Sequence, residues 1–200
     1  MATNGKGLLS LSEEQIVSCD KADGNDGCNG GDQLPALLWL AKQPNGQVRA
    51  KRWGGRWQSM FSRVVCITRL TSLPTLAPSL QCSEESYPYT SGGGNTGKCK
   101  TACTGVVKIT TGTEVQKHNE TALQVAIANS PLSLSVDASN DAVWQSYSGG
   151  VVTEKCSTCK DASCLDHGVT GVGYGTDAGV DYWLIKNSWS ASVRGGGGGG

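Results

Sequence analysis

Cysteine is the residue that most constrains what this chain can fold into, because there are nine cysteines in 200 residues. That density is unusual for cytosolic proteins, whose thiols are kept reduced, and it is typical of proteins that fold in an oxidising compartment. The sequence therefore predicts a fold held together by disulfide bonds. Because nine is an odd number, we expect at least one cysteine without a partner in the chain.

Charge and hydropathy exclude several classes of protein. The 17 basic residues are balanced by 17 acidic ones, so there is no positive excess to hold a phosphate backbone and we expect no nucleic-acid partner. No apolar run reaches the roughly 20 residues that cross a bilayer, so we expect no membrane partner. The opening MATNGKGLLSLS lacks the charged start and apolar core of a signal peptide. We therefore expect an incomplete chain.

Residues 48–81 differ in composition from their surroundings. Five of the six arginines and the single Phe lie in this window, which holds six basic residues and no acidic one. Val48-Arg49 and Gln81 can be encoded by the common start and end of an intron, and the 34 residues correspond to 102 nucleotides, a multiple of three. We interpret 48–81 as an unspliced intron read in frame, and the alternative is a genuine basic surface loop. On the intron interpretation it should be irregular, with few contacts to strands after residue 131.

The remaining chain predicts an α+β fold with helices first and strands later. Ser12-Glu13-Glu14-Gln15 is a capping-box pattern that opens a short helix, and residues 34–42 predict a mostly buried helix. Apolar residues alternate from 132 to 136, and further strands are expected at 168–175 and 180–187 around a turn at 176–179. Helices and strands are thus segregated rather than alternating.

Asn119 has two possible roles. It is expected to cap a short helix, and Asn119-Glu120-Thr121 is also an N-glycosylation sequon, a triplet that occurs often by chance.

The two histidines differ in setting. His118 lies in a polar stretch and is expected to be a solvated surface residue. His167 enters a predicted strand, where its imidazole can serve as a general acid and base near neutral pH. Asn187 follows another predicted strand, and its side-chain oxygen can accept the imidazole N–H while Trp189 shields that bond. This is the base and orienting half of a nucleophilic triad, although a core His and a strand-end Asn would explain the same residues.

A zinc module is an alternative interpretation of the same segment. Cys156, Cys159, Cys164 and His167 offer four ligands at a spacing compatible with a small zinc knuckle.

Five sequence motifs together resemble the papain family of cysteine proteases: LSLSEEQIVSCD, GCNGG, SEESYPY, LDHGV with GVGYG, and YWLIKNSW. The resemblance covers about residues 6–43 and 82–190. It implies a papain-like two-domain fold, with a remnant of the helical left domain at 1–108, a β-barrel right domain at 109–190, and a glycine tail at 191–200. It also implies peptide-bond hydrolysis of protein or peptide substrates by a monomer without a cofactor. An intact parent is expected to be lysosomal, vacuolar or extracellular.

The resemblance also implies roles for individual residues. His167 corresponds to the catalytic histidine, Asn187 to the residue that orients it, and Trp189 to the indole covering the pair. Gly30 and Gly31 correspond to glycines whose backbone pairs with substrate, since glycine has no Cβ in the way. Asp166 and Ser135 correspond to residues lining the substrate site.

Departures from the family pattern concern the nucleophile and the cysteines. The 200 residues contain no Cys-Gly-Ser-Cys-Trp-type motif, and after Asn-Ser-Trp the chain runs into Ser-Ala-Ser-Val-Arg and glycines instead of the family's next strand. This chain is therefore expected to be truncated at both ends and inactive, and a catalytically dead homologue that binds other molecules is an alternative. The resemblance implies a Cys19–Cys99 disulfide and leaves Cys28 and Cys156 without partners. It assigns no pairing to five others, namely Cys66, Cys82, Cys103, Cys159 and Cys164.

Overall fold

The computed structural model of the chain describes residues 9–43, 65–66, 70–71, 80–100, 102–109, 111–139, 142–153 and 164–189. The chain divides into two compact units, the first made of residues 1–57 and 68–112 and the second of 58–67 and 113–200. The chain therefore passes from one unit to the other after residues 57, 67 and 112. The glycine tail predicted at 191–200 lies outside the described residues. Within the described ranges, no helix is long and apolar enough to cross a membrane.

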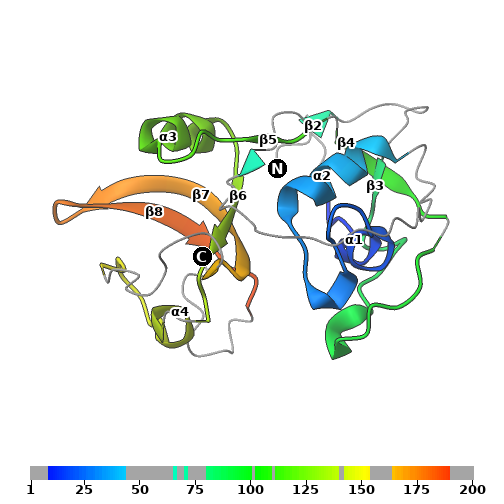
Figure 1. Cartoon of the computed structure of the whole chain (residues 1–200). Helices are drawn as coiled ribbons and strands as arrows, with labels where there is room; N and C mark the ends of the chain where they lie inside the picture. The colour runs from blue at the N-terminus through cyan, green and yellow to red at the C-terminus, as the bar shows by residue number, and fades with distance from the viewer. Residues whose placement is uncertain are drawn as a thin grey trace. The chain divides into compact units, whose positions relative to one another are not determined.

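The first unit combines two helices with a small antiparallel sheet (Figure 1). The helices are α1 (Glu13–Cys19) and α2 (Gln33–Lys42), and single 3-10 turns lie at η1 (Gly27–Asn29) and η2 (Ser91–Gly93). The sheet has the strand order β2-β4-β3, with β2 (Leu70–Thr71), β4 (Gly105–Ile109) and β3 (Leu80–Cys82). The unit that the sequence predicted as helical therefore also contains strands.

A buried polar network joins the start of α1 to β3. Ser12 caps the helix as predicted, because its Oγ accepts the main-chain N–H of Gln15 at 3.1 Å. The Gln15 Oε1 accepts the N–H of Cys82 at 2.8 Å, and the N–H of Ser12 donates to the Cys82 carbonyl at 3.0 Å. Ser12 and Gln15 are both fully buried, so these bonds satisfy groups that water cannot reach. The capping-box residues thus hold the helix against the strand.

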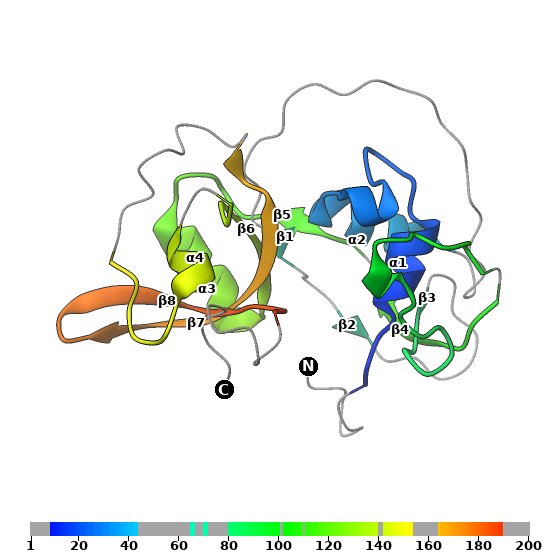
Figure 2. The ribbon, with the colours of Figure 1, turned by 90° about the horizontal axis from the view of Figure 1, so that it is seen from below.

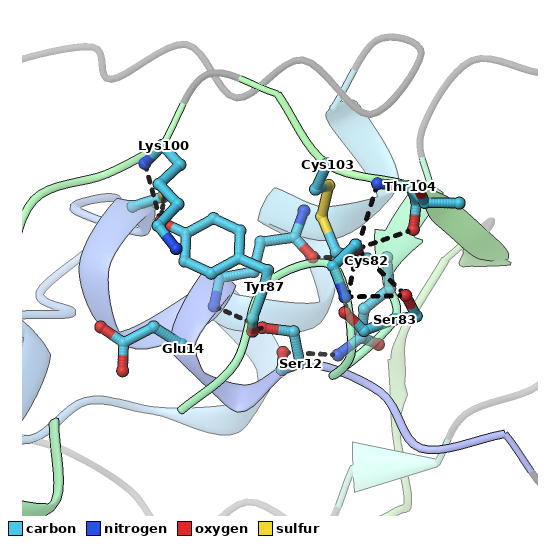
Figure 3. The surroundings of a disulfide bond; sticks show 12 residues. Ser12, Glu14, Cys82, Ser83, Tyr87, Lys100, Cys103 and Thr104 are labelled. Carbon is cyan, nitrogen blue, oxygen red and sulfur yellow. Dashed lines mark hydrogen bonds between the residues drawn. A yellow bond between two sulfur atoms is a disulfide. The ribbon is translucent and has the colours of Figure 1, made fainter. Parts of the chain in front are cut away.

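Two disulfides close this unit around the network. Cys19 at the end of α1 bonds to Cys99, and Cys82 bonds to Cys103 just ahead of β4. Figure 3 shows the Cys82–Cys103 bridge close to Ser12 and the ring of Tyr87. The side chain of Tyr87 is fully buried, and its hydroxyl accepts the N–H of Lys100 at 2.7 Å.

Glu14 of α1 anchors the loop that contains η2. Its Oε2 accepts the main-chain N–H groups of Thr90 and Ser91 at 2.9 and 3.0 Å, and its Oε1 accepts the Ser91 hydroxyl at 3.0 Å. Burial of the carboxylate opposes ionisation, but the hydrogen bonds from Thr90 and Ser91 outweigh it and hold the pKa of Glu14 below its ordinary value. The ionised form is therefore the one that the fold stabilises.

The second unit is an antiparallel sheet with the strand order β5-β1-β6-β7-β8. Its strands are β5 (Thr113–Glu114), β1 (Val65–Cys66), β6 (Leu132–Val136), β7 (His167–Asp177) and β8 (Val180–Lys186), accompanied by α3 (Glu120–Asn129) and α4 (Ala142–Ser146). Strands β7 and β8 run side by side as a long hairpin in both views (Figures 1 and 2). Among the strands described here, no pairing closes the sheet into the expected barrel. The α+β class and the late strands are as predicted.

The core of this unit lies between α3 and the sheet. Ile127 of α3 packs with Leu132 and Leu134 of β6 and with Val169 of β7, and all four are buried. The hairpin turn has positive φ angles at Ala178 and Gly179, 48° and 82°, which is the two-residue geometry that matches the twist of paired strands. In β6, the alternating apolar residues after residue 131 thus predict both the strand and the face of it that is buried.

The prediction that 48–81 is irregular is wrong at three places. Strands β1, β2 and the first two residues of β3 lie in this window, and β1 pairs with β6 through Val65 opposite Ser133. The expectation of few contacts with later strands is therefore wrong for β1. Backbone pairing needs only free main-chain groups at a neighbouring strand, so a segment without a periodic apolar pattern can still join a sheet. Most of the window lies outside the described residues.

We predict that Glu14→Gln lowers the free energy of unfolding by about 1–3 kcal/mol at pH 7, because the charged acceptor of the two buried Ser91 donors and of the Thr90 N–H is lost. The folded-state pKa of Glu14 is lowered, so its contribution is present above the unfolded value of about 4.3 and disappears as the pH falls through the folded value. Urea unfolding at pH 7 and at acidic pH measures both effects. Glu13→Gln, at the exposed neighbouring position, is the control and should change little; equal losses in the two variants would contradict the prediction.

A second prediction concerns crowding in the core of the second unit. A Cβ on Gly171 would lie 2.8 Å from Leu134 Cδ1 and 3.0 Å from Ile127 Cδ1. Gly171→Ala should therefore lower the free energy of unfolding by about 1–3 kcal/mol through overpacking. At Gly173 the nearest atoms to such a Cβ are 3.9 Å away, so Gly173→Ala is the matched control. Thermal unfolding of the two variants should separate them, and a more stable Gly171→Ala protein would contradict this packing.

Candidate functional site

The strands of the second unit bring His167 and Asn187 to one end of the sheet. His167 is the first residue of β7 and lies opposite Val136, the last residue of β6. Strand β8 runs antiparallel to β7, with Lys186 opposite Thr170, so Asn187 follows the end of β8 close to the start of β7. Antiparallel pairing thus places side chains that are distant in sequence next to one another.

A hydrogen bond joins the two side chains. The His167 Nε2 and the Asn187 Oδ1 are 2.8 Å apart. The N–H of Ser188 also donates to the Asn187 Oδ1 at 2.8 Å. Because a main-chain N–H only donates, the atom that it meets must be the amide oxygen, and the His167 Nε2 must then carry the proton. In the neutral ring this leaves Nδ1 as the nitrogen that can accept a proton.

Trp189 lies beside this pair. Its ring centroid is 4.9 Å from that of His167, with 31° between the ring planes. The Nδ2 of Asn187 is buried without a hydrogen-bond partner in the described part of the chain. Leaving a buried amide nitrogen without a partner costs free energy. The two hydrogen bonds to the Asn187 oxygen therefore fix the side chain in this orientation and offset that cost.

Asp166 and Ser135 lie at the same end of the sheet. Ser135 of β6 is partly buried and lies opposite Gly168, the residue after His167. Asp166 is exposed, its N–H donates to the Val136 carbonyl at 3.1 Å, and its Oδ1 accepts the N–H of Ala138 at 2.8 Å. A hydrogen bond from the Ser139 side chain, with further main-chain bonds, holds the pKa of Asp166 below its ordinary value. Its carboxylate therefore fastens the segment after β6 beside His167.

Gly30 and Gly31 belong to the first unit and have different structural roles. Gly30 has φ 111°, its N–H donates to the Gly27 carbonyl at 3.2 Å, and its own carbonyl accepts the N–H of Asp26 at 2.9 Å. A Cβ on Gly31 would lie 2.4 Å from the Oδ1 of Asn25. Gly30 thus adopts a positive φ, which favours glycine. Gly31 allows the Asn25 side chain to approach the backbone closely.

Asn25 organises this glycine loop, and the sequence did not single it out. Its Oδ1 accepts the N–H of Asp32 at 2.7 Å, and its Nδ2 donates to the carboxylate of Asp20. Asp20 is fully buried, and this burial raises the pKa of its carboxyl. The clustering of Asn, Asp and Gly in residues 20–31 predicted a loop, but it carried no signal for which side chain would hold it.

The cysteines take up several pairings. Cys19 and Cys99 form the disulfide that the resemblance implies, with a Cα–Cα distance of 4.7 Å, and Cys28 is free and exposed. Cys82 pairs with Cys103, a pairing that the sequence did not supply. Cys164 is disulfide-bonded.

The zinc alternative is wrong for Cys164, because a disulfide sulfur is not the thiolate that zinc requires. Cys156 and Cys159 lie outside the described residues. The described ranges contain no group of three or more His, Cys, Asp or Glu that could hold a metal ion.

Comparison with known proteins identifies the family. A profile described as papain family cysteine protease matches residues 1–53 and 78–197. A low-temperature-induced cysteine proteinase of Solanum lycopersicum is 33% identical over 94% of this chain and 42% of its own length. Digestive cysteine proteinase 3 of Homarus americanus is 35% identical over 92% of this chain and 45% of its own length. The chain thus spans less than half the length of these curated relatives.

Solved structures agree with this assignment. The bromelain protease from Ananas comosus, in complex with an inhibitor, superposes with a TM-score of 0.64 at 28% identity, covering 97% of this chain and 68% of that one. The proform of the ragweed pollen allergen Amb a 11, a cysteine protease, gives 0.65 at 30% identity, with 94% and 40% covered. The fold is that of papain-like proteases. The chain belongs to the papain family of cysteine proteases.

We predict that Asn187→Ala exposes the His167 Nε2 proton to rapid exchange with water. In the unsubstituted protein this proton is hydrogen-bonded to Asn187 and lies beside Trp189, so its signal should be visible in the downfield proton NMR spectrum. Ser188→Ala should keep the signal, because only the main-chain N–H of Ser188 contacts Asn187. Trp189→Ala should keep the bond but speed up exchange. An unchanged signal in Asn187→Ala would contradict the assignment of the bond.

Proposed function

We propose that the protein to which this chain belongs is a cysteine endopeptidase and that His167 is its catalytic base and acid. The observation that carries the proposal is the bond from the His167 Nε2 to the Asn187 Oδ1. It holds the ring in one orientation and leaves Nδ1 to exchange a proton with a thiol. Asn187 is the orienting residue, and Trp189 supports the pair by restricting the access of water.

The proposed chemistry is hydrolysis of a peptide bond through a thioester. The Nδ1 of His167 takes the proton of a cysteine thiol, and the resulting thiolate attacks the peptide carbonyl carbon. The imidazolium then protonates the leaving amine. A water molecule, activated by the same nitrogen, releases the acid product. The nucleophile belongs to a motif that is not among the 200 residues, so we expect this chain alone to be inactive.

The proposed substrates are proteins or peptides. Gly31 is the better candidate for pairing with a substrate backbone, since both main-chain groups of Gly30 are already used within its own loop. Ser135 is proposed to line the specificity pocket, and Asp166 to shape the wall beside His167. The disulfides are consistent with an oxidising setting, so we propose a lysosomal, vacuolar or extracellular location.

We also propose that 48–81 is not part of the ancestral fold. Residues 54–77, which fall within this window, are the internal stretch that the family profile leaves unmatched. Strands β1 and β2 pair through main-chain groups, so their pairing does not require that the segment was inherited from the family. Sequencing of the transcript tests the proposal: abundant messages with the window retained would support a genuine insertion instead.

The decisive test of the function uses the same transcript. If it encodes a Cys-Gly-Ser-Cys-Trp-type motif upstream in frame, the longer chain should cleave a fluorogenic dipeptide substrate under reducing, mildly acidic conditions. His167→Ala should then reduce kcat/KM by about 10²–10⁴-fold, the range for loss of general acid–base catalysis. The 200-residue chain should show no turnover. His118→Ala is the control and should retain full activity.

Two outcomes would contradict the proposal. Turnover by the longer chain that survives His167→Ala would remove His167 from the mechanism. A longer chain that folds and binds peptides without cleaving them would favour the catalytically dead homologue.

A further inference from the structure

The sequon Asn119-Glu120-Thr121 lies on an accessible turn at the start of α3. Asn119 is partly exposed, and Glu120 and Thr121 are exposed. The preceding residue, His118, has φ 56°, a left-handed conformation that turns the chain sharply before the helix. The segment that a glycosylating enzyme must reach is therefore on the surface.

The two atoms of the Asn119 amide have separate tasks. Its oxygen accepts the main-chain N–H of Ala122 at 2.9 Å and so caps α3. Since that N–H can only donate, the atom facing it must be Oδ1, and Nδ2 must face away from the helix. The Nδ2 donates to the Gln116 Oε1 at 2.9 Å, and Gln116 is itself exposed. The atom that would carry a sugar is thus on the solvent side, and its bond in the described part of the chain is to a surface side chain.

We propose that Asn119 is a site of N-linked glycosylation and that the glycan and the helix cap coexist on one side chain. The proposal relies on the proposed function only for entry into the secretory pathway. Three observations support it beyond the triplet itself: the exposure of the sequon, the outward Nδ2, and disulfides that indicate an oxidising compartment.

The chemistry is a transfer from a lipid-pyrophosphate-linked oligosaccharide. The Asn119 Nδ2 forms a bond to C1 of the first sugar, the bond from C1 to the pyrophosphate oxygen breaks, and the amide loses one proton as the lipid pyrophosphate leaves. The amide keeps one N–H, which can still donate to Gln116. Its oxygen is untouched, so the cap on α3 is retained.

The test is translation of the full 200-residue chain, fused to a cleavable signal sequence, in the presence of endoplasmic-reticulum microsomes. The chain inside the microsomes is identified by its protection from added protease. We expect a glycosylated product that peptide N-glycosidase returns to the unmodified mobility. Thr121→Ser preserves the sequon and should be modified, whereas Thr121→Val removes it and should not. A protected chain that stays unmodified would overturn the proposal.

A second measurement tests the coexistence of glycan and cap in the protein secreted by eukaryotic cells. Peptide N-glycosidase converts Asn119 to Asp, which is also a good capping residue. Removal of the glycan should therefore leave the thermal unfolding midpoint nearly unchanged, while Asn119→Ala should lower it. A drop on enzymatic removal as large as that in Asn119→Ala would contradict a retained cap. His167→Ala should be glycosylated normally, which separates this proposal from the proposed catalytic role.

Discussion

The second unit depends on strand β7, which pairs with β6 on one side and β8 on the other. The first pairing places His167 at the end of β6, and the second returns the chain so that Asn187 meets the imidazole at 2.8 Å. Val169 packs with Ile127 of α3 on the apolar face of the same strand, and at Gly171 a Cβ would crowd the same side chain. Because register fixes every side chain on a strand, a slip of one residue in either pairing would separate the His167 and Asn187 side chains.

Buried polar contacts join the distant segments of the first unit, beside an apolar core that includes Leu40, Val107 and Ile109. Water hardly reaches three polar residues in the first turn of α1 and its cap, namely Ser12, Glu14 and Gln15. The side-chain oxygens of Glu14 and Gln15 accept bonds from Ser91 and Cys82, and the Ser12 hydroxyl donates to the Tyr87 carbonyl, all distant along the chain. Fully satisfied buried networks define one arrangement of the chain, because any alternative leaves donors unpaired. The disulfides Cys19–Cys99 and Cys82–Cys103 lock the same segments together.

Several features could be predicted because their causes are local. The helix start at Ser12, the alternating strand after residue 131 and the turn before Val180 each follow from neighbouring residues. Other features could not be predicted because their partners are distant in sequence. No local pattern indicated that Cys82 pairs with Cys103, that Asn25 supports the backbone at Gly31, or that Val65 lies opposite Ser133.

The sequence by itself determined the family, the α+β class and the identity of His167, Asn187 and Trp189 as candidates, because the motifs that carry them are short and continuous. Only the tertiary structure decided which atom of each side chain does what. The N–H of Ser188 identifies the Asn187 oxygen and hence the protonated nitrogen of His167. The N–H of Ala122 likewise directs the Asn119 Nδ2 toward solvent. These assignments depend on hydrogen-bond direction, which is a property of atoms in space and is not encoded in residue type or spacing.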